Sequence, residues 1–362
     1  MDKVRVAIVG CGTISRLNVP GYIEDERCEV AVLCDPVRER AEVRAKEWGI
    51  APRFYTAFED VLNDDRIDAV ELLTPTYMHP QQIIDCLGAG KHVSCQKPIS
   101  STVEEADRVI EASGKSDRIC RITENFLYYP PIVKAKELID SGAIGDPSLV
   151  HIRANIGKEA LPRRTDILQR EMDENPEAFG WRKDPQLNAG GIMYDGGWHL
   201  YATAMWWVGD EVERLSSLVT KTDDLTDETP SAAIMKLKDR DCLLTFSYST
   251  SSNMPIRAKY YPGDEFFEVI GDRGILWVTR CTGEFLDMPP VVLHTGRGSE
   301  GFQLPMDWID GFKGAAQGFV SSIIDGTQPQ MDVGFSKKVL QVALGIYIAS
   351  DTGRTIDPGA LG

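Results

Sequence analysis

Three side chains in this sequence, Lys97, Asp195 and His199, are of types that could move a proton to or from a hydroxyl group. Asp195 and His199 stand four residues apart. If a helix begins here, this spacing places both side chains on one face, where the carboxylate can fix the orientation of the imidazole. Lys97 stands before Pro98 at the end of an apolar run, and its charge could stabilise a developing alkoxide. The set is typical of acid–base chemistry on a hydroxyl.

Each of these residues also has an ordinary structural interpretation. A lone lysine is usually a solvated surface charge, and an Asp–His pair can belong to a core. Asp195 and His199 could instead bind a metal ion, but no third ligand stands at suitable spacing, and we expect no metal. The neighbouring sequence is rich in glycine, which indicates backbone brought close to a ligand or to another element; these glycines are Gly190, Gly191, Gly196 and Gly197.

A glycine turn near the start of the chain has the composition of a nucleotide site. Gly10-Cys11-Gly12-Thr13-Ile14-Ser15 directly follows the first apolar run and opens a predicted helix. One glycine permits the tight turn, and the other lets the backbone approach a pyrophosphate at the helix N-terminus. Ser15 stands in the place of the third glycine of this fingerprint, and an ordinary tight turn is the competing interpretation.

Asp35 ends the second apolar run, 25 residues after Gly10. A carboxylate there can accept hydrogen bonds from the adenosine ribose hydroxyls, and it repels the additional phosphate of NADP. Arg38 could offset that repulsion, and Asp35 could also serve as a helix N-cap before Pro36. On balance the sequence predicts NAD as the cofactor.

Thr74-Pro75 ends a later apolar run at the carboxyl edge of the predicted sheet, which is the edge where ligands bind in open α/β sheets. His79 begins the helix that follows, and it either faces solvent or contacts a ligand. Lys97 follows another strand at the same edge. The sequence therefore places the lysine beside the predicted nucleotide site.

The elements that must position these residues follow two rhythms. Up to about residue 125, apolar runs alternate with helix-length polar stretches. Runs that are apolar throughout predict parallel strands buried on both faces, and hence an α/β domain with a doubly wound sheet. The predicted strands are Val4–Val9, Glu29–Cys34, Ala69–Thr74, His92–Cys95 and Ile119–Thr123.

From about Pro147 onward, strand follows strand, and polar turns between them favour antiparallel connections. This half is predicted to be an α+β domain with a large, mainly antiparallel sheet, closed by two helices near Trp308–Ile324 and Ser336–Ser350. The charged stretch Lys158–Gly180 is interpreted as a surface loop or lid. The predicted strands are Leu149–Asn155, Leu215–Thr220, Ser231–Leu237, Cys242–Ser249, Phe266–Ile270 and Ile275–Val278.

Composition excludes several classes of protein. The chain has 362 residues, 43% of them hydrophobic, and a formal charge of −16. This length predicts two domains with sizeable cores, and the acidic balance disfavours nucleic acid and anionic membranes as partners. The apolar runs are too short to span a bilayer and no signal-peptide pattern is present, so we expect a cytoplasmic protein. Eight scattered cysteines predict reduced core thiols.

Together these segments resemble the glucose–fructose oxidoreductase, inositol dehydrogenase and rhizopine-catabolism family, the nicotinamide-dependent sugar and polyol oxidoreductases. The likeness covers nearly the whole chain, with the motifs in the same order. It implies a Rossmann domain over residues 1–125 and a domain with an open-faced sheet over residues 126–362. The motifs are Val6–Gly12, Cys34–Pro36, Thr74-Pro75 with His79, Ala89–Val93 before Lys97-Pro98, Ile139–Gly145, Trp181-Arg182, Gly190-Gly191, Asp195 with Gly197 and His199, and Gly326 with Pro329.

The resemblance also implies roles for single residues. Lys97 would lie near the nicotinamide and the reacting hydroxyl, Asp195 would be its carboxylate partner, and His199 would transfer the proton. The implied cofactor-binding residues are Gly10, Gly12, Thr13, Ile14, Asp35, Thr74, Pro75, His79, Lys97, Trp181 and Arg182. The implied substrate-binding residues are Lys97, Asn125, Tyr128, Asp195 and His199.

Two positions depart from the family pattern. Gln96 replaces the usual Glu before Lys-Pro, which removes a carboxylate that would favour the charged lysine, and Thr203 replaces an Asp four residues beyond the family histidine. Neither change removes an atom that the chemistry requires. Four aromatic residues could stack on a sugar, although each is more often plain packing; they are Tyr128, Tyr129, Trp181 and Trp198.

The residues and the resemblance predict reversible hydride transfer between NAD and a secondary hydroxyl of a sugar, cyclic polyol or glycoside. Three alternatives stay open: a lyase or glycosidase that uses bound NAD transiently, an oxidoreductase that exchanges hydride between two sugars on a bound cofactor, and a non-catalytic sugar sensor. Which of Lys97 and His199 first accepts the proton is also open. Predicted strands with apolar residues on both faces, such as Ala232–Met235, predict a homo-oligomer (a dimer, tetramer or hexamer) formed through the second sheet.

Overall fold

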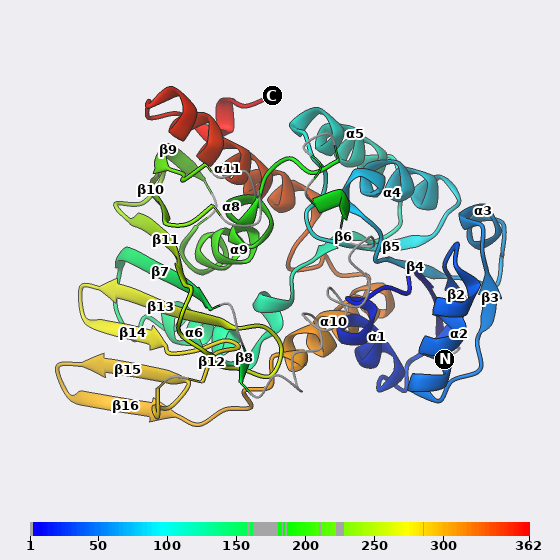
Figure 1. Ribbon diagram of the computed structural model, residues 1–362, viewed down its shortest axis with the longest axis horizontal. Helices are drawn as coiled ribbons and strands as arrows, with labels where there is room; N and C mark the ends of the chain where they lie inside the picture. The colour runs from blue at the N-terminus through cyan, green and yellow to red at the C-terminus, as the bar shows by residue number, and fades with distance from the viewer. Residues whose placement is uncertain are drawn as a thin grey trace. The chain divides into compact units, whose positions relative to one another are not determined.

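The computed structural model describes residues 3–157, 160–161, 180–182, 184, 187–209, 211–221, 228–284 and 286–362. Contacts between residues divide the chain into two units, which are drawn in Figure 1. The first contains residues 1–125 and 311–337, and the second contains residues 126–310 and 338–362. Most of the loop or lid expected at Lys158–Gly180 lies outside the described residues.

The described part of the first unit forms a six-stranded parallel sheet in the order β3-β2-β1-β4-β5-β6. Strand β1 is buried at five of its six positions, as expected of a strand covered on both faces. The predicted doubly wound α/β domain is therefore confirmed. The strands are β1 (Val4–Val9), β2 (Cys28–Cys34), β3 (Arg53–Tyr55), β4 (Ala69–Leu72), β5 (His92–Gln96) and β6 (Cys120–Thr123).

The helices between these strands are α1 (Ser15–Ile23), α2 (Arg38–Trp48), α3 (Phe58–Leu62), α4 (His79–Gly88) and α5 (Val103–Gly114). A 3₁₀ turn, η1 (Thr76–Met78), precedes α4. The sequence did not predict β3, because its three residues are only half-buried and carry no apolar run. The other strands begin or end within one or two residues of their predicted bounds.

A segment from near the end of the chain packs with the first unit. In helix α10 (Ile309–Asp325), Phe319 joins the hydrophobic core formed around β1. A Cβ added to Gly21 of α1 would lie only 2.6 Å from the Cα of Lys313, so the two helices meet at a glycine. Further along, the Ile122 N–H of β6 donates to the carbonyl of Met331 at 3.2 Å. The expected second domain, residues 126–362, thus includes a segment that completes the core of the first unit.

The second unit contains a mixed eight-stranded sheet in the order β16-β15-β14-β13-β7-β11-β10-β9. Within the described strands of this eight-stranded sheet, only the β11–β7 pair is parallel, which confirms a mainly antiparallel sheet. The strands are β7 (Pro147–Gly157), β9 (Val212–Leu218), β10 (Ser231–Leu237), β11 (Leu243–Ser251), β13 (Gly263–Gly271), β14 (Gly274–Val278), β15 (Val291–Thr295) and β16 (Gly298–Phe302). Two short strands, β8 (Ala160–Leu161) and β12 (Ile256–Arg257), pair separately.

The helices of this unit lie on one side of its sheet, as Figure 1 shows for α6 (Pro130–Asp140) and α9 (Gly197–Val208). On the other face of the sheet, apolar side chains are exposed: Leu218 by 77%, Ile234 by 45% and Leu243 by 38%. Along β10, buried and exposed positions alternate, as expected when one face packs on a core and the other does not. The sheet therefore has one covered and one open face.

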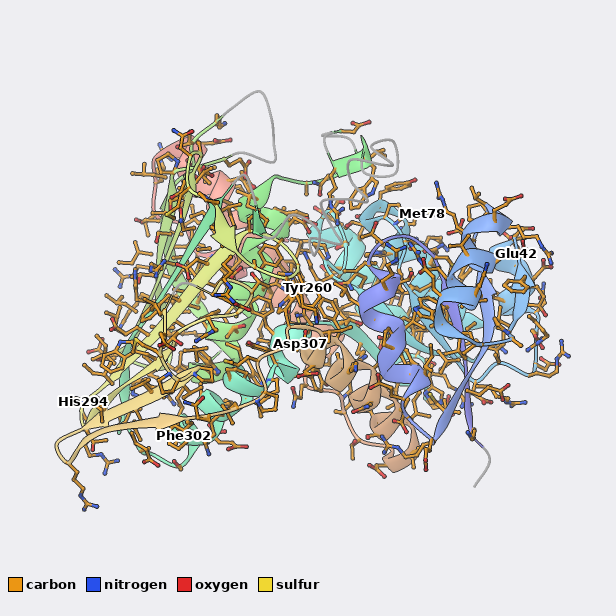
Figure 2. The ribbon with its side chains drawn as sticks, turned by 60° about the horizontal axis from the view of Figure 1, so that its bottom comes forward. Glu42, Met78, Tyr260, His294, Phe302 and Asp307 are labelled. Atoms are coloured by element: carbon orange, nitrogen blue, oxygen red, sulfur yellow. The ribbon has the colours of Figure 1, made fainter. Side chains whose placement is uncertain are left out.

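The hairpin of β15 and β16 extends the sheet beyond the strands that the sequence predicted. Figure 2 labels His294 on β15 and Phe302 at the end of β16. Helix α11 (Val333–Thr352) then runs to a final 3₁₀ turn, η5 (Pro358–Ala360). All eight cysteines are buried and free. Within the described residues, no helix is both long enough and apolar enough to cross a bilayer.

Candidate active site

The glycine turn after β1 has the geometry of a nucleotide-binding turn. Gly10 adopts a φ of +96°, and a Cβ there would lie 2.6 Å from the carbonyl oxygen of Leu73, so only glycine fits. Among the described residues, no atom lies within 4 Å of a Cβ added to Gly12, which leaves open space before the N-terminus of α1. Ser15 is buried and donates its hydroxyl to the Gly12 carbonyl at 2.6 Å. A serine therefore fits where the fingerprint has a third glycine.

Asp35 ties this turn to the end of β2. Its two carboxylate oxygens accept hydrogen bonds from the backbone N–H groups of Cys11 and Val37, each at 2.9 Å. Helix α2 begins only at Arg38, with Val37 as its N-cap residue, so the alternative role of Asp35 as the N-cap is wrong. A carboxylate oxygen that accepts one hydrogen bond keeps a lone pair for another. Asp35 thus retains acceptor capacity for ribose hydroxyls.

Arg38 was the residue that could have offset the charge of Asp35. Its Nε instead lies 2.7 Å from the Glu42 carboxylate, and its guanidinium lies over the ring of Phe54, 5.5 Å from the centroid. The side chain is therefore held along its own helix and against β3. Arg38 therefore does not pair with Asp35, and among the described residues the nearest cation to that carboxylate is Arg40, with Nη1 at 3.9 Å from Oδ1.

His79 begins α4, as predicted, but it neither faces solvent nor remains free for a ligand. Only 1% exposed, it places Nδ1 2.7 Å from the Pro98 carbonyl oxygen and Nε2 2.8 Å from the Thr74 carbonyl oxygen. Burial lowers the pKa of this histidine. Thr74 in turn donates its hydroxyl to Gln82 at 2.6 Å. His79 therefore joins the segments that follow β4 and β5, including the residue next to Lys97.

Lys97 directly follows β5, at the carboxyl edge of the parallel sheet, as predicted. Its backbone N–H donates to Oε1 of Gln96 at 2.9 Å. An amide oxygen accepts this bond as a carboxylate would, so the change from the family's glutamate preserves the contact. What it removes is a negative charge next to the lysine.

In the second unit, Asp195 ends the short helix α8 (Ile192–Asp195), and His199 stands in the first turn of α9. Gly196 between them has helical dihedral angles, so the expected four-residue helical spacing is present. Oδ2 of Asp195 lies 3.3 Å from Nε of Arg182, whose guanidinium lies 4.9 Å from the ring centroid of Trp181. Arg182, which the resemblance assigns to the cofactor, thus lies at the carboxylate of Asp195, and Trp181 packs on Arg182.

The imidazole of His199 is stacked on Phe126, with ring centroids 4.7 Å apart and planes 13° apart. Phe126 is buried and packs edge-on against Phe267 of β13 at 6.4 Å. Thr203, which replaces the family's aspartate, donates its hydroxyl to the His199 carbonyl at 2.7 Å. Phe126 was not singled out from the sequence, because nothing in its spacing distinguishes a ring that orients a histidine from ordinary core. Stacking against a fixed ring orients the imidazole.

The glycine pair Gly190–Gly191 makes room for another element of the protein. A Cβ on Gly190 would lie 2.7 Å from the ring of Tyr347 in α11, and the Gly191 N–H donates to the Tyr347 hydroxyl at 2.9 Å. That hydroxyl donates to Glu228 at 2.6 Å, and Glu228 also accepts the Met193 N–H at 3.1 Å. These contacts fix the start of α8, and hence the helix that ends at Asp195.

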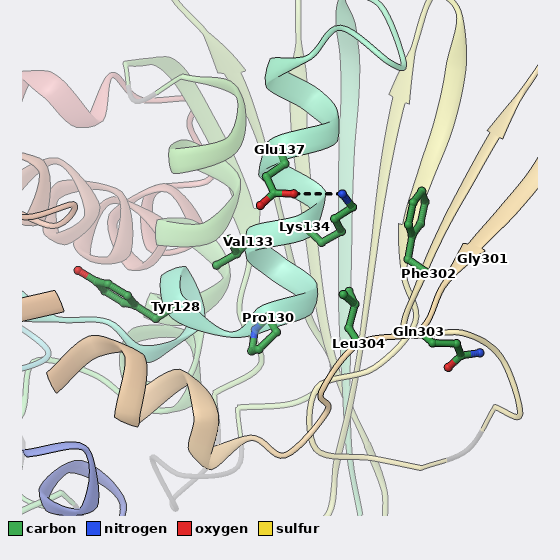
Figure 3. Close-up of a pocket in the computed structure, with 9 residues that line it drawn as sticks. All are labelled: Tyr128, Pro130, Val133, Lys134, Glu137, Gly301, Phe302, Gln303 and Leu304. Atoms are coloured by element: carbon green, nitrogen blue, oxygen red, sulfur yellow. Dashed lines mark hydrogen bonds and ion pairs between the residues drawn. The ribbon is translucent and has the colours of Figure 1, made fainter. Parts of the chain in front are cut away.

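The two residues expected to bind substrate, Asn125 and Tyr128, lie at the ends of a 3₁₀ turn, η2 (Asn125–Tyr128). Asn125 is 2% exposed, and its Nδ2 has no hydrogen-bond partner among the residues that the structure describes. Tyr128 lines a pocket of about 660 Å³, shown in Figure 3, next to Lys134 and Glu137 of α6. That pocket is not lined by Lys97, Asp195 or His199, and we assign it no role.

Two of the four aromatic residues considered for sugar stacking are core residues. Trp198 and Tyr129 are both fully buried, and the Tyr129 hydroxyl donates to the carbonyl of Met306 at 3.1 Å. Their role is therefore packing. Lys97 belongs to the first unit, whereas Asp195 and His199 belong to the second, so their meeting in one site is part of the proposal below.

Comparison with known protein families matches both halves of the chain. Residues 4–124 match an oxidoreductase family with an NAD-binding Rossmann fold, and residues 132–277 match the GFO/IDH/MocA C-terminal domain. The chain belongs to the GFO/IDH/MocA oxidoreductase family. The resemblance predicted from the motifs is confirmed, and with it an oxidoreductase that has an NAD-binding Rossmann domain.

Several curated dehydrogenases are similar to this chain. D-xylose 1-dehydrogenase [NADP(+)] of Haloarcula marismortui is 24% identical over 359 residues, which cover 98% of this chain and 93% of that enzyme. Inositol 2-dehydrogenase of Salmonella typhimurium is 34% identical over 152 residues, which cover 41% of this chain and 45% of that enzyme. The inositol dehydrogenase match is the more identical but spans less than half of either chain.

Solved structures of similar fold cover the whole GFO/IDH/MocA architecture. Levoglucosan dehydrogenase in complex with NADH and levoglucosan has a TM-score of 0.81 at 16% identity, covering 98% of this chain and 99% of that one. An oxidoreductase from Agrobacterium radiobacter in complex with NAD+, L-tartaric acid and magnesium also has a TM-score of 0.81, at 17% identity, covering 99% and 100%. At these identities, the likeness shows the fold.

Proposed function

We propose that this protein is an NAD-dependent dehydrogenase that transfers a hydride between NAD and a secondary hydroxyl of a sugar, cyclic polyol or glycoside. The observation that carries the proposal is the His199 imidazole, stacked on Phe126 in the first turn of α9, one turn after Asp195. A sensor has no need of an oriented acid–base residue. Relatives that act on xylose, inositol and levoglucosan support a polyhydroxylated substrate.

The residues of the first unit fit a dinucleotide. The open space at Gly12, together with Thr13 and Ile14 before α1, would receive the pyrophosphate. The Asp35 carboxylate would accept hydrogen bonds from the ribose hydroxyls. Thr74 and Pro75 follow β4 at the same carboxyl edge of the sheet, which Lys97 also occupies, and His79 would act on the cofactor only by holding these segments together. A bound nicotinamide supplies the hydride acceptor.

The protein's own residues would move the proton. His199 would accept the proton of the substrate hydroxyl, and Asp195 would hold the imidazole and stabilise its cationic form. Lys97 would hydrogen-bond the same oxygen and stabilise the charge that develops on it. Because Arg182 is paired with Asp195, it would hold that carboxylate in place. Asn125 and Tyr128 would bind further hydroxyls of the substrate.

NAD is the proposed cofactor in preference to NADP. The buried Asp35 would repel an additional phosphate, and Arg38, which could have attracted one, is paired with Glu42. The xylose dehydrogenase named above uses NADP. The charge next to the ribose would therefore decide between NAD and NADP in each protein. The same reasoning makes Asp35 the residue whose replacement tests the preference.

We also propose that the chain forms a homo-oligomer through the open face of the second sheet. Leu218, Ile234 and Leu243 leave a large apolar area exposed there, and a second copy of the chain would cover it. A cytoplasmic location is part of the proposal, because eight buried and free cysteines suit a reducing compartment.

The test is a screen of the purified protein with NAD against monosaccharides, inositols and glycosides, following the accumulation of NADH by its ultraviolet absorbance. We expect the protein to oxidise at least one of these compounds and to release more moles of NADH than there are moles of enzyme. Product without NADH accumulation would instead identify a lyase, glycosidase or sugar–sugar oxidoreductase that retains its cofactor. Ligand binding without any turnover would identify a sensor.

A further inference from the structure

The buried face of the second sheet changes character at one row of residues. Tyr248 of β11 pairs in register with Ala154 of β7, and Ala154 pairs with Glu265 of β13. Residues in register on neighbouring strands project to the same face of a sheet. The next row on that face is Phe246, Ile152 and Phe267, and the one after it is Leu244, Val150 and Val269. The face is therefore apolar until the row that contains Tyr248 and Glu265.

This polar row lies beneath the proton-transfer pair. A Cβ added to Gly196 would lie 2.8 Å from the Tyr248 hydroxyl oxygen, so that hydroxyl meets the turn between Asp195 and α9. Three residues after Gly196, His199 stacks on Phe126, and Phe126 packs on Phe267, two residues from Glu265 on the same face of β13. The Tyr248 hydroxyl is thus directed at the backbone that carries the candidate catalytic residues.

The Tyr248 hydroxyl differs from the other buried tyrosine hydroxyls in what it contacts. Tyr248 is 5% exposed, yet no residue in the described part of the chain forms a hydrogen bond with its hydroxyl. The hydroxyl oxygen is not one of the fully enclosed polar atoms that lack a partner, so it reaches solvent-accessible space, where water or a ligand can form a hydrogen bond with it. By contrast, Tyr22 bonds Glu71, Tyr129 the Met306 carbonyl, Tyr201 the Met193 carbonyl, Tyr261 Glu265, and Tyr347 Glu228.

The surrounding charges keep this hydroxyl protonated. Burial, together with the nearby carboxylates of Glu265 and Asp195, raises the pKa of Tyr248 well above its usual range. The group is therefore a hydrogen-bond donor at any physiological pH. Glu265 itself accepts from the Tyr261 hydroxyl and from Thr282. The Glu265 carboxylate therefore already accepts hydrogen bonds from protein groups, whereas the Tyr248 hydroxyl donates to none among the described residues.

We propose that Tyr248 is a specificity-determining residue that donates a hydrogen bond to an oxygen of the substrate bound beside Asp195 and His199. A side chain at position 196 would collide both with Cδ1 of Ile192, at 2.7 Å, and with the Tyr248 hydroxyl, at 2.8 Å. The inference rests on the proposed function, since it assigns a ligand group to the same site. It identifies the ligand chemistry as a hydroxyl or ring oxygen that accepts a hydrogen bond, set apart from the oxygen that is oxidised.

The test compares Tyr248→Phe with wild type, using D-xylose, myo-inositol and levoglucosan as probes and then the monodeoxy analogues of the best of them. Tyr248→Phe should lower kcat/KM by roughly tenfold to a hundredfold, and its melting temperature should stay equal or rise, because the lost hydroxyl bonds no protein group. Wild type should lose about the same factor on one deoxy analogue, and Tyr248→Phe should treat that analogue and the parent alike.

The matched control is Tyr260→Phe, which removes a buried hydroxyl bonded to Asp307. It should lower the melting temperature and leave kcat/KM unchanged. If wild type oxidises a substrate and Tyr248→Phe has the same kcat/KM, the inference is overturned and the proposed function stands. A Tyr248→Phe protein that unfolds, or that loses the same factor on every deoxy analogue, would also overturn it. A wild type that oxidises no sugar, polyol or glycoside would refute the proposed function itself.

Discussion

Replacing Glu265 by glutamine should change how the stability of the fold depends on pH. Glu265 is 2% exposed on β13 and forms no ion pair with any residue that the structure describes. Its carboxylate accepts from the Tyr261 hydroxyl and, at 3.4 Å, from the Thr282 hydroxyl. Burial outweighs these bonds and raises the pKa of Glu265 from 4.5 to about 7. The proton is therefore held more tightly in the folded protein than in the unfolded chain.

The size and sign of the effect follow from linkage. A shift from 4.5 to about 7, at about 1.4 kcal/mol per unit, corresponds to roughly 3 kcal/mol. Because the folded-state pKa is the higher one, this stabilisation is fully present below pH 4.5 and is lost as the pH rises through about 7. Glu265→Gln cannot lose a proton, so its unfolding free energy should lack this decrease.

The assay is urea unfolding of wild type and Glu265→Gln at a series of pH values across that interval. The difference between the two unfolding free energies should change by up to about 3 kcal/mol in favour of the variant as the pH rises. Other groups that titrate cancel in the difference. Tyr261→Phe, which removes a donor to the carboxylate, should raise the Glu265 pKa further, so that the decrease starts at the same pH but continues to higher pH. A difference that does not vary with pH would refute the reasoning.

Three further predictions concern the site and the open sheet face. Asp35→Ser should weaken NAD binding and narrow its advantage over NADP, as measured by fluorescence titration; a wild type that binds NADP as well as NAD would contradict this. Lys97→Ala should lower kcat by about 10² to 10⁴, and its combination with His199→Ala should cost far less than the product of the two effects, in steady-state assays of all variants; multiplicative losses would show that the two act independently. Ile234→Lys should dissociate the oligomer in sedimentation experiments, whereas a wild type that sediments as a single chain would refute the open-face interface.

The sequence predicts the fold well where the pattern is local. Apolar runs such as Val4–Val9 are long enough to identify buried parallel strands. The turn that follows Val9 begins with Gly10, whose positive φ requires a glycine. The four-residue spacing of Asp195 and His199 likewise predicts that both lie on the same face of a helix, because four residues correspond to about one turn. These features depend on neighbours in the sequence, and one chain is enough to show them.

Features that depend on distant neighbours could not be predicted. Position 190 has no room for a side chain because the ring of Tyr347, more than 150 residues further along the chain, packs against it. Phe126 orients His199, but a phenylalanine in a buried turn has no pattern that distinguishes it from core packing. Helix α10 has the same amphipathic pattern whichever unit it covers, and only the structure shows that Phe319 joins the core of the first. His79, too, required the fold to show that it joins two strand ends.

The central claim is that His199 is the proton-transfer residue of a nicotinamide-dependent dehydrogenase. The most direct measurement is kcat for His199→Ala with the best substrate, alongside His294→Ala, which removes an exposed histidine on the β15–β16 hairpin (Figure 2). Nucleotide affinity is measured separately by fluorescence. The account predicts a loss of about 10² to 10⁴ in kcat for His199→Ala with NAD still bound, and wild-type kcat for His294→Ala. Near-wild-type turnover of His199→Ala would contradict it.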